Sequence, residues 1–88
     1  MIESSVDVVN RAGLHTRPAA MLVKIASKFQ SEIYLVRDGF SINAKSIIGV
    51  MTLAAEQGAR LGLTVVGADE QEAANAIKDL FASGFDEP

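Results

Sequence analysis

Stretches of alternating apolar and polar residues are interleaved with stretches in which apolar residues recur every three or four positions, and this order strongly constrains the fold. Alternation is typical of a strand with one buried face, whereas a spacing of three and four is typical of an amphipathic helix. Alternation occurs within residues 2–9, 32–44 and 59–67, and helical spacing from 16 to about 29 and within 46–58 and 69–84. The predicted order is therefore β-α-β-β-α-β-α.

Local signals support these elements. Asp38-Gly39 lies between two β-prone runs and suits a tight hairpin turn with positive φ. Pro18 fits only in the first turn of a helix, where a missing N–H group costs nothing. Ser46 is a candidate N-cap for the short middle helix.

The last helix has the clearest boundaries. Asp69 and Glu72 form a start that resembles a capping box, and Gly84 stands where a C-cap is expected. Its apolar stripe is Ala73, Ile77, Leu80 and Phe81. The fold class that we predict is α+β, a two-layer sandwich whose four-stranded antiparallel sheet is covered on one face by helices.

Composition excludes several classes of function. The chain has no cysteine, so thiolate chemistry and cysteine metal sites are absent, and we expect no metal and no cofactor with only one histidine present. The net charge of −3 argues against nucleic acid as a partner. Residues 1–45 nevertheless carry six Lys/Arg against four Asp/Glu, which suits an anionic ligand or an acidic partner.

Length and hydropathy indicate one domain over residues 1–88. Hydrophobic residues make up 49% of the chain, which favours a globular fold. No apolar run approaches the ~18 residues of a membrane span, and the first nine residues lack a basic segment before an apolar one. We therefore expect a cytoplasmic protein without membrane insertion.

The stretch AGLHTRPAA contains the only histidine, His15, immediately before a predicted helix. The first N–H groups of a helix have no internal partner and attract anions. Arg17 is suited to grip a phosphate, and Gly13 allows the backbone to turn tightly so that the imidazole faces outward. The pattern favours a histidine that carries a phosphoryl group, although a capping or surface histidine is the plainer alternative.

The stretches GLHTRPAA, AKSIIGVMTLA and DEQEA resemble HPr, the histidine-containing phosphocarrier family of the bacterial phosphoenolpyruvate-dependent phosphotransferase system. The resemblance covers essentially the whole chain and implies an open-faced β-sandwich. It further implies that His15 is phosphorylated on Nδ1, that Arg17 stabilises the phosphate, and that Ser46 is a regulatory phosphorylation site. Ser46 can serve as an N-cap and as a modified serine at once.

The resemblance also implies the partners: enzyme I as donor, enzyme IIA domains as acceptors, and HPr kinase/phosphorylase acting on Ser46. Such a protein is a relay and not an enzyme, and we expect a monomer. The implied partner-binding residues are Thr16, Ala20, Ile47, Ile48, Met51 and Thr52. Periodicity alone would place the apolar residues of this set in the core as readily as on the surface.

Three functions use these residues. The first is phosphoryl relay for sugar uptake. The second is a regulatory phosphoprotein that acts through protein contacts, and the tail LFASGFDEP is similar to the nitrogen-related branch of the family. The third is a small-ligand-binding domain in which His15 is only a contact.

Overall fold

The computed structural model describes residues 1–88, and its elements follow the predicted order. The strands are β1 (Ile2–Asp7), β2 (Glu32–Arg37), β3 (Phe40–Asn43) and β4 (Arg60–Val66), and the helices are α1 (Thr16–Ala26), α2 (Ile47–Thr52) and α3 (Glu70–Ala82). The strands form one antiparallel sheet in the order β1-β4-β2-β3. The predicted α+β class is therefore confirmed. None of the helices combines the length and apolarity needed to cross a membrane.

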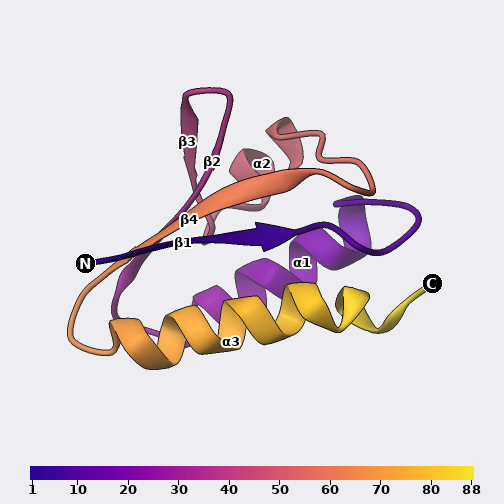
Figure 1. Cartoon of the computed structure of the whole chain (residues 1–88). Helices are drawn as coiled ribbons and strands as arrows, with labels where there is room; N and C mark the ends of the chain where they lie inside the picture. The colour runs from indigo at the N-terminus through magenta and orange to yellow at the C-terminus, as the bar shows by residue number, and fades with distance from the viewer.

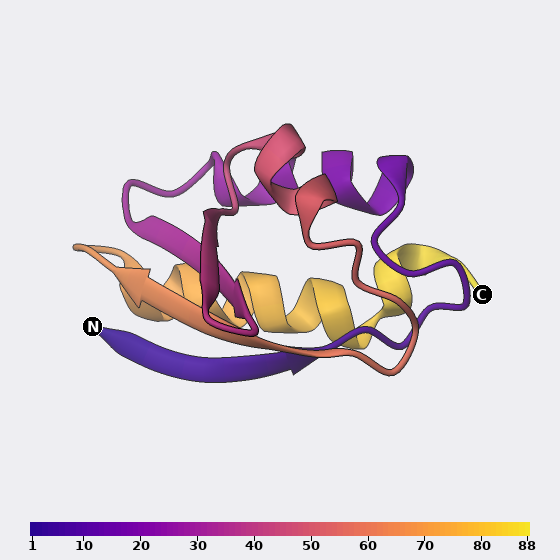
Figure 2. The same ribbon diagram turned by 90° about the horizontal axis from the view of Figure 1, so that it is seen from above.

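The core lies between the sheet and the helices. Figure 1 shows α1 and α3 running along one face of the sheet, and the view from above in Figure 2 shows α2 beside α1. Alternate residues of β4, namely Leu61, Leu63 and Val65, are buried, as the alternation predicts. They pack with the buried faces of α1 and α3, which include Ala19, Leu22, Ala26, Ala73, Ile77 and Phe81.

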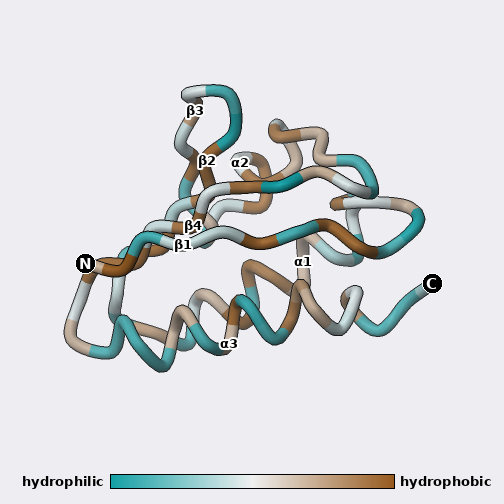
Figure 3. The backbone as a smooth tube through the Cα atoms, viewed as in Figure 1, coloured by the Kyte–Doolittle hydropathy of each residue, from teal (hydrophilic) through white to brown (hydrophobic).

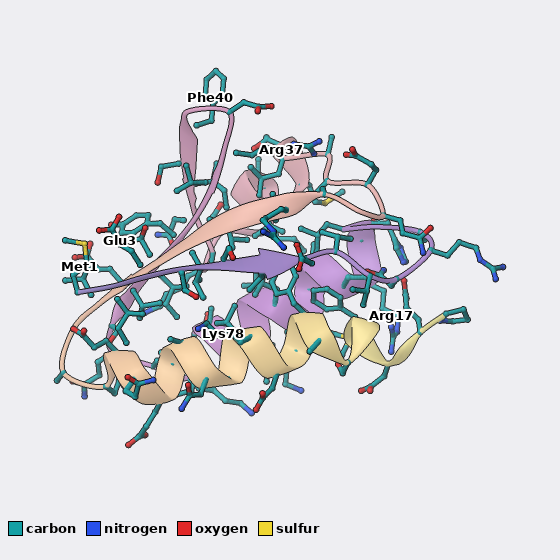
Figure 4. All side chains as sticks on the ribbon, in the orientation of Figure 1. Met1, Glu3, Arg17, Arg37, Phe40 and Lys78 are labelled. Atoms are coloured by element: carbon teal, nitrogen blue, oxygen red, sulfur yellow. The ribbon has the colours of Figure 1, made fainter.

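The β2–β3 hairpin turns at the predicted pair. Asp38 and Gly39 have φ values of 51° and 82°, and Arg37 pairs directly with Phe40 across the turn. Two successive positive φ values are typical of the two-residue turn that matches the twist of the strands. Phe40 projects from the tip of this hairpin, where its side chain is 75% exposed (Figure 4).

Two helices are shorter than their hydrophobic pattern predicts. The first ends at Ala26 and not near Phe29, because the amides of Lys28 and Phe29 bond to carbonyls only three residues back. Phe29 still packs against the core from the following turn. The helix α2 ends at Thr52, and the positive φ of 47° at Ala54 prevents its continuation.

Asp69 precedes α3, but its side chain does not cap the helix as the capping-box pattern predicts. Its carboxylate instead accepts hydrogen bonds from the amides of Gln30 and Ser31, each at 2.9 Å, and from the Ser31 hydroxyl. The Ser31 hydroxyl in particular lowers the pKa of Asp69 below its usual value. The residue therefore joins the start of α3 to the segment before β2.

Residues 84–88, called the tail below, turn back after α3. The C-cap residue of α3 is Ser83, one position before the predicted Gly84, and Gly84 follows it with φ 65°. Phe85 and Asp86 also have positive φ values of 56° and 57°. Phe85 is fully buried, with its ring centroid 4.9 Å from that of Phe81. Figures 1 and 2 both place the C-terminus beside the loop between β1 and α1, and Figure 3 shows that the end of the tail is hydrophilic.

Candidate functional site

The loop between β1 and α1 is anchored by a hydrogen bond to the segment that follows α2. The Leu14 amide bonds to the Ala55 carbonyl at 2.9 Å, and Leu14 itself is buried. Gly13 has φ 72°, and a Cβ atom there would overlap the carbonyl oxygen of Ala55. Glycine is needed here both for its conformation and for the close approach of the two backbones.

Substitution of Gly13 by alanine should therefore lower the free energy of unfolding by about 1–3 kcal/mol. The matched control is Gly39→Ala, because Gly39 has φ 82° but no atom within 4 Å of its added Cβ. That control should lose only the conformational part, about 1 kcal/mol. Equal losses in urea unfolding of the two variants would contradict the close-approach argument.

His15 lies at the N-cap position of α1, with its backbone extended (φ −79°, ψ −170°). Its side chain is 41% exposed and does not cap the helix. The backbone N–H groups of Thr16 and Arg17 make no hydrogen bond, so two donors at the helix start are free beside the imidazole. His15 is thus the N-cap residue by position, but its side chain does not act as a cap.

Arg17 is the second residue of α1, and Figure 4 shows its side chain beside the tail. Its Nη1 atom donates to the Phe85 carbonyl oxygen and to Glu87 Oε2, each at 2.9 Å. Its Nη2 and Nε atoms make no hydrogen bond. One edge of the guanidinium is thus anchored, whereas the other donors are available to an anion.

Glu87 completes the site. Its Oε1 atom lies 2.8 Å from both His15 Nε2 and Asn10 Nδ2, and its side chain is only 15% exposed. The hydrogen bond with His15, followed by that with Asn10, lowers the pKa of Glu87 below its usual value. Glu87 is therefore an ionised carboxylate near neutral pH.

The surface around His15 is a shallow hollow. It has a volume of about 300 Å³ and is lined by Arg11, Ala12, His15, Glu87 and Pro88. The structure contains no group of three or more His, Cys, Asp or Glu side chains placed to hold a metal ion. An open hollow with an exposed imidazole suits contact with a protein partner better than enclosure of a small ligand.

The six predicted partner-binding residues are all exposed. The side chains of Ile47, Ile48 and Met51 are 40%, 75% and 43% exposed, and Val50 is the one buried residue of α2. Of the two placements that periodicity left open for these apolar side chains, the structure therefore has the surface and not the core. We call the six residues Thr16, Ala20, Ile47, Ile48, Met51 and Thr52 the docking face.

Ser46 is the N-cap residue of α2, as predicted. Its Oγ atom accepts a hydrogen bond from the Gly49 amide at 3.1 Å. The side chain is half-buried, and the next two residues, Ile47 and Ile48, belong to the docking face. A change of charge at Ser46 would therefore act directly beside that face.

Two side chains at the site, Asn10 and Glu87, were not predicted from the sequence. Both lie near His15 only because the tail returns to the β1–α1 loop, where the Arg11 amide bonds to the Pro88 carbonyl oxygen at 2.7 Å. Glu87 is 72 positions from His15 along the chain, beyond the reach of any local pattern. Residues 46–88 carry two Lys/Arg against seven Asp/Glu, and this acidic excess is the only signal in the sequence that points to an acidic side chain from this half of the chain.

Comparison with known proteins agrees with the fold. The family model described as "PTS HPr component phosphorylation site" matches residues 2–83. Phosphocarrier protein HPr of Treponema pallidum is 53% identical over 87 residues, which are 99% of each chain. The crystal structure of HPr from Thermoanaerobacter tengcongensis has a TM-score of 0.95 and 45% identity, and the match covers 100% of this chain and 99% of that one.

Bacillus subtilis Crh, which forms a domain-swapped, intertwined dimer, is a further structural relative. It has a TM-score of 0.77 and 39% identity, and the match covers 96% of this chain and 97% of that one. The fold and the matched phosphorylation-site model define a phosphocarrier of the phosphotransferase system. The chain belongs to the HPr family.

Proposed function

We propose that His15 accepts a phosphoryl group on Nδ1 from phosphorylated enzyme I and passes it to enzyme IIA domains. The observation that carries this proposal is that free donors lie at the same helix start as an exposed imidazole. Two unbonded amides and two unbonded guanidinium nitrogens of Arg17 lie at the same helix end. Together these donors can form hydrogen bonds to the negatively charged oxygens of a phosphoryl group.

Exposure supports relay and not catalysis on a small substrate. A carrier must give its phosphoryl group to a second protein, so the reacting nitrogen has to remain reachable from solvent. The His15 side chain meets this requirement because it is 41% exposed, and the side chain of the nearby Arg17 is itself 50% exposed. The role of Arg17 in the proposal is to neutralise phosphoryl oxygens during both transfers.

The docking face would meet the partners. Its apolar side chains offer area for burial, and Thr16 and Ala20 are followed at the same helical spacing by the exposed Lys24. A mixed apolar and basic surface favours a partner with apolar contacts inside an acidic rim.

We further propose that the protein acts as a cytoplasmic monomer.

Incubation with enzyme I and phosphoenolpyruvate, followed by intact-mass measurement, tests the function. We expect the mass of one phosphoryl group to be added, and the modification to survive base and to be lost in mild acid. The unreacted protein without enzyme I is the control. A chain that gains no mass, or that gains an acid-stable group, would contradict the proposal.

Ser46 would regulate this transfer when phosphorylated by HPr kinase/phosphorylase. A phosphoserine brings about −1.5 to −2 charge beside the docking face. That charge would be costly to bury against apolar partner atoms and would repel an acidic partner surface. The fold itself should tolerate it, because Ser46 already lies at the start of α2.

The Ser46→Asp variant should therefore raise the apparent KM for transfer from enzyme I and leave the melting temperature nearly unchanged. Ser46→Ala should transfer normally but lose the bond to the Gly49 amide, which is worth about 0.5–2 kcal/mol of stability. Steady-state transfer assays and thermal melts of both variants measure these effects. Equal kinetics for wild type, Ser46→Asp and phosphorylated Ser46 would leave Ser46 as a cap only.

The nitrogen-related alternative uses the same phosphoryl chemistry on His15 but ends in protein contacts without sugar transport. The similarity of LFASGFDEP, residues 80–88, to the nitrogen-related branch favours this alternative. Transfer from the phosphorylated protein to IIA domains of sugar permeases distinguishes the two, since only the relay for sugar uptake requires rapid transfer to such domains.

A further inference from the structure

Glu87 contacts His15 on the ring nitrogen opposite the proposed phosphoryl acceptor. Its Oε1 atom lies 2.8 Å from Nε2, and the carboxylate is held in turn by Asn10 Nδ2 and Arg17 Nη1. An ionised carboxylate only accepts hydrogen bonds. The short contact therefore requires the proton of the neutral imidazole to lie on Nε2, which leaves the lone pair on Nδ1.

We propose that Glu87 is a positioning residue for phosphoryl transfer: its carboxylate holds the Nε2–H tautomer of His15 and so keeps Nδ1 ready to bond to phosphorus. This inference rests on the proposed function, because it assigns a role to Glu87 in the reaction of His15. A carboxylate behind a reacting or metal-binding histidine sets the ring tautomer in the same way in other sites.

The tail is built to deliver this carboxylate. Phe85 is fully buried although its φ is 56°, a conformation that costs a bulky residue energy and persists only where the surroundings enforce it. Its aromatic contact with Phe81 anchors the turn, and its carbonyl oxygen accepts from Arg17. The strained turn therefore places Glu87 two residues later at the imidazole.

Asn10 holds the carboxylate from the other side. It is 1% exposed, and its Nδ2 atom donates at 2.8 Å to both the Gly13 carbonyl oxygen and Glu87 Oε1. Its Oδ1 atom is buried without a hydrogen-bond partner. The Gly13 carbonyl oxygen and Glu87 Oε1 together fix the orientation of the Asn10 amide. Asn10 thereby links the loop to the tail, and its Oδ1 atom is left without a donor.

The proposed arrangement balances the reaction without any proton transfer. The Nδ1 lone pair forms the N–P bond while the bond between phosphorus and the donor atom of enzyme I breaks. The ring then carries phosphorus on Nδ1, a proton on Nε2 and a positive charge, which lies against the Glu87 carboxylate. When a nucleophilic atom of the acceptor protein bonds to phosphorus, the N–P bond breaks, its electron pair returns to Nδ1, and the neutral Nε2–H imidazole is restored.

Arg17 can serve Glu87 and the phosphoryl group together. Its bonds to the tail use only Nη1, whereas Nη2 and Nε are unbonded. The tail contact therefore does not need to break when phosphorus arrives. Glu87 stays at Nε2 throughout the cycle. This distinguishes a positioning residue from a side chain that blocks His15 and must leave before the phosphoryl group can bind.

The test compares Glu87→Gln with Asp86→Asn, which removes the same charge from the neighbouring exposed tail residue. A glutamine has one acceptor oxygen where the carboxylate offers two, so it cannot serve both His15 and Arg17. Ring ¹⁵N NMR spectra of the unphosphorylated proteins should show the Nε2–H tautomer in wild type and Asp86→Asn, and a mixture in Glu87→Gln. Glu87→Leu, which has no acceptor, should show at least as large a change.

Single-turnover transfer from enzyme I should slow about tenfold in Glu87→Gln and remain unchanged in Asp86→Asn. An unchanged tautomer, or an unchanged rate, in both Glu87 variants would overturn the proposal. The ring spectra need no phosphoryl donor, so they test the tautomer even if the wild type fails to react. Failure of the wild type to gain a phosphoryl group would instead contradict the proposed function.

Discussion

Replacement of His15 by alanine should abolish phosphoryl acceptance from enzyme I and leave the fold intact. This is the largest effect that we expect, because the chain has no other histidine. The imidazole is partly exposed, does not cap α1, and makes only the hydrogen bond to Glu87, so its loss removes little from the folded structure. Intact-mass measurement after reaction, together with a thermal melt, checks both halves of this result.

Lys78→Ala provides the control for His15→Ala. Lys78 lies on α3, is exposed, and makes no hydrogen bond or ion pair (Figure 4). This variant should be phosphorylated at the wild-type rate. Phosphorylation of the His15→Ala protein by enzyme I would contradict the assignment of the site.

Arg17→Ala should slow transfer about ten- to a hundredfold without a comparable loss of stability. A charge-assisted contact to phosphate contributes about 1.5–3 kcal/mol, and all of it appears in the rate if the contact forms in the transition state. The side chain is half exposed and bonds only to the tail. Single-turnover rates and melting temperatures measure the two effects separately.

The tail contacts of Arg17 require a second control. Loss of Arg17 also removes a donor to Glu87, so part of the slowing could come from the tail. If the loss in Arg17→Ala clearly exceeds the loss in Glu87→Gln, the free donors of the guanidinium act on the phosphoryl group itself. A rate equal to wild type in Arg17→Ala would remove Arg17 from the site.

Local patterns predicted the parts of this fold that depend on local physics. The turn at Asp38-Gly39 follows from two residues that tolerate positive φ, and burial along β4 follows from strict alternation. The apolar spacing predicts an end of α1 that is too late, because Phe29 continues the spacing although it packs on the core from a turn. Hydrophobic spacing records which side chains are buried and does not record where the helical hydrogen bonds stop.

Only the part of the site that lies within one short stretch of sequence could be predicted. His15, Arg17 and Gly13 lie within five residues, so their joint role can be inferred from a short stretch at a helix start. Asp69 and Glu87 are acidic residues near helix ends, where local rules suggest a cap or a solvated tail. The structure gives each a distant partner instead, Ser31 and His15 respectively.

The most direct test of the central claim is the position of phosphorus on the imidazole ring. NMR spectra of the phosphorylated protein, uniformly labelled with ¹⁵N, resolve the two ring nitrogens of His15 and their coupling to ³¹P. We predict that phosphorus is bonded to Nδ1 and that Nε2 carries a proton. Phosphorus on Nε2, or on any residue other than His15, would contradict the account.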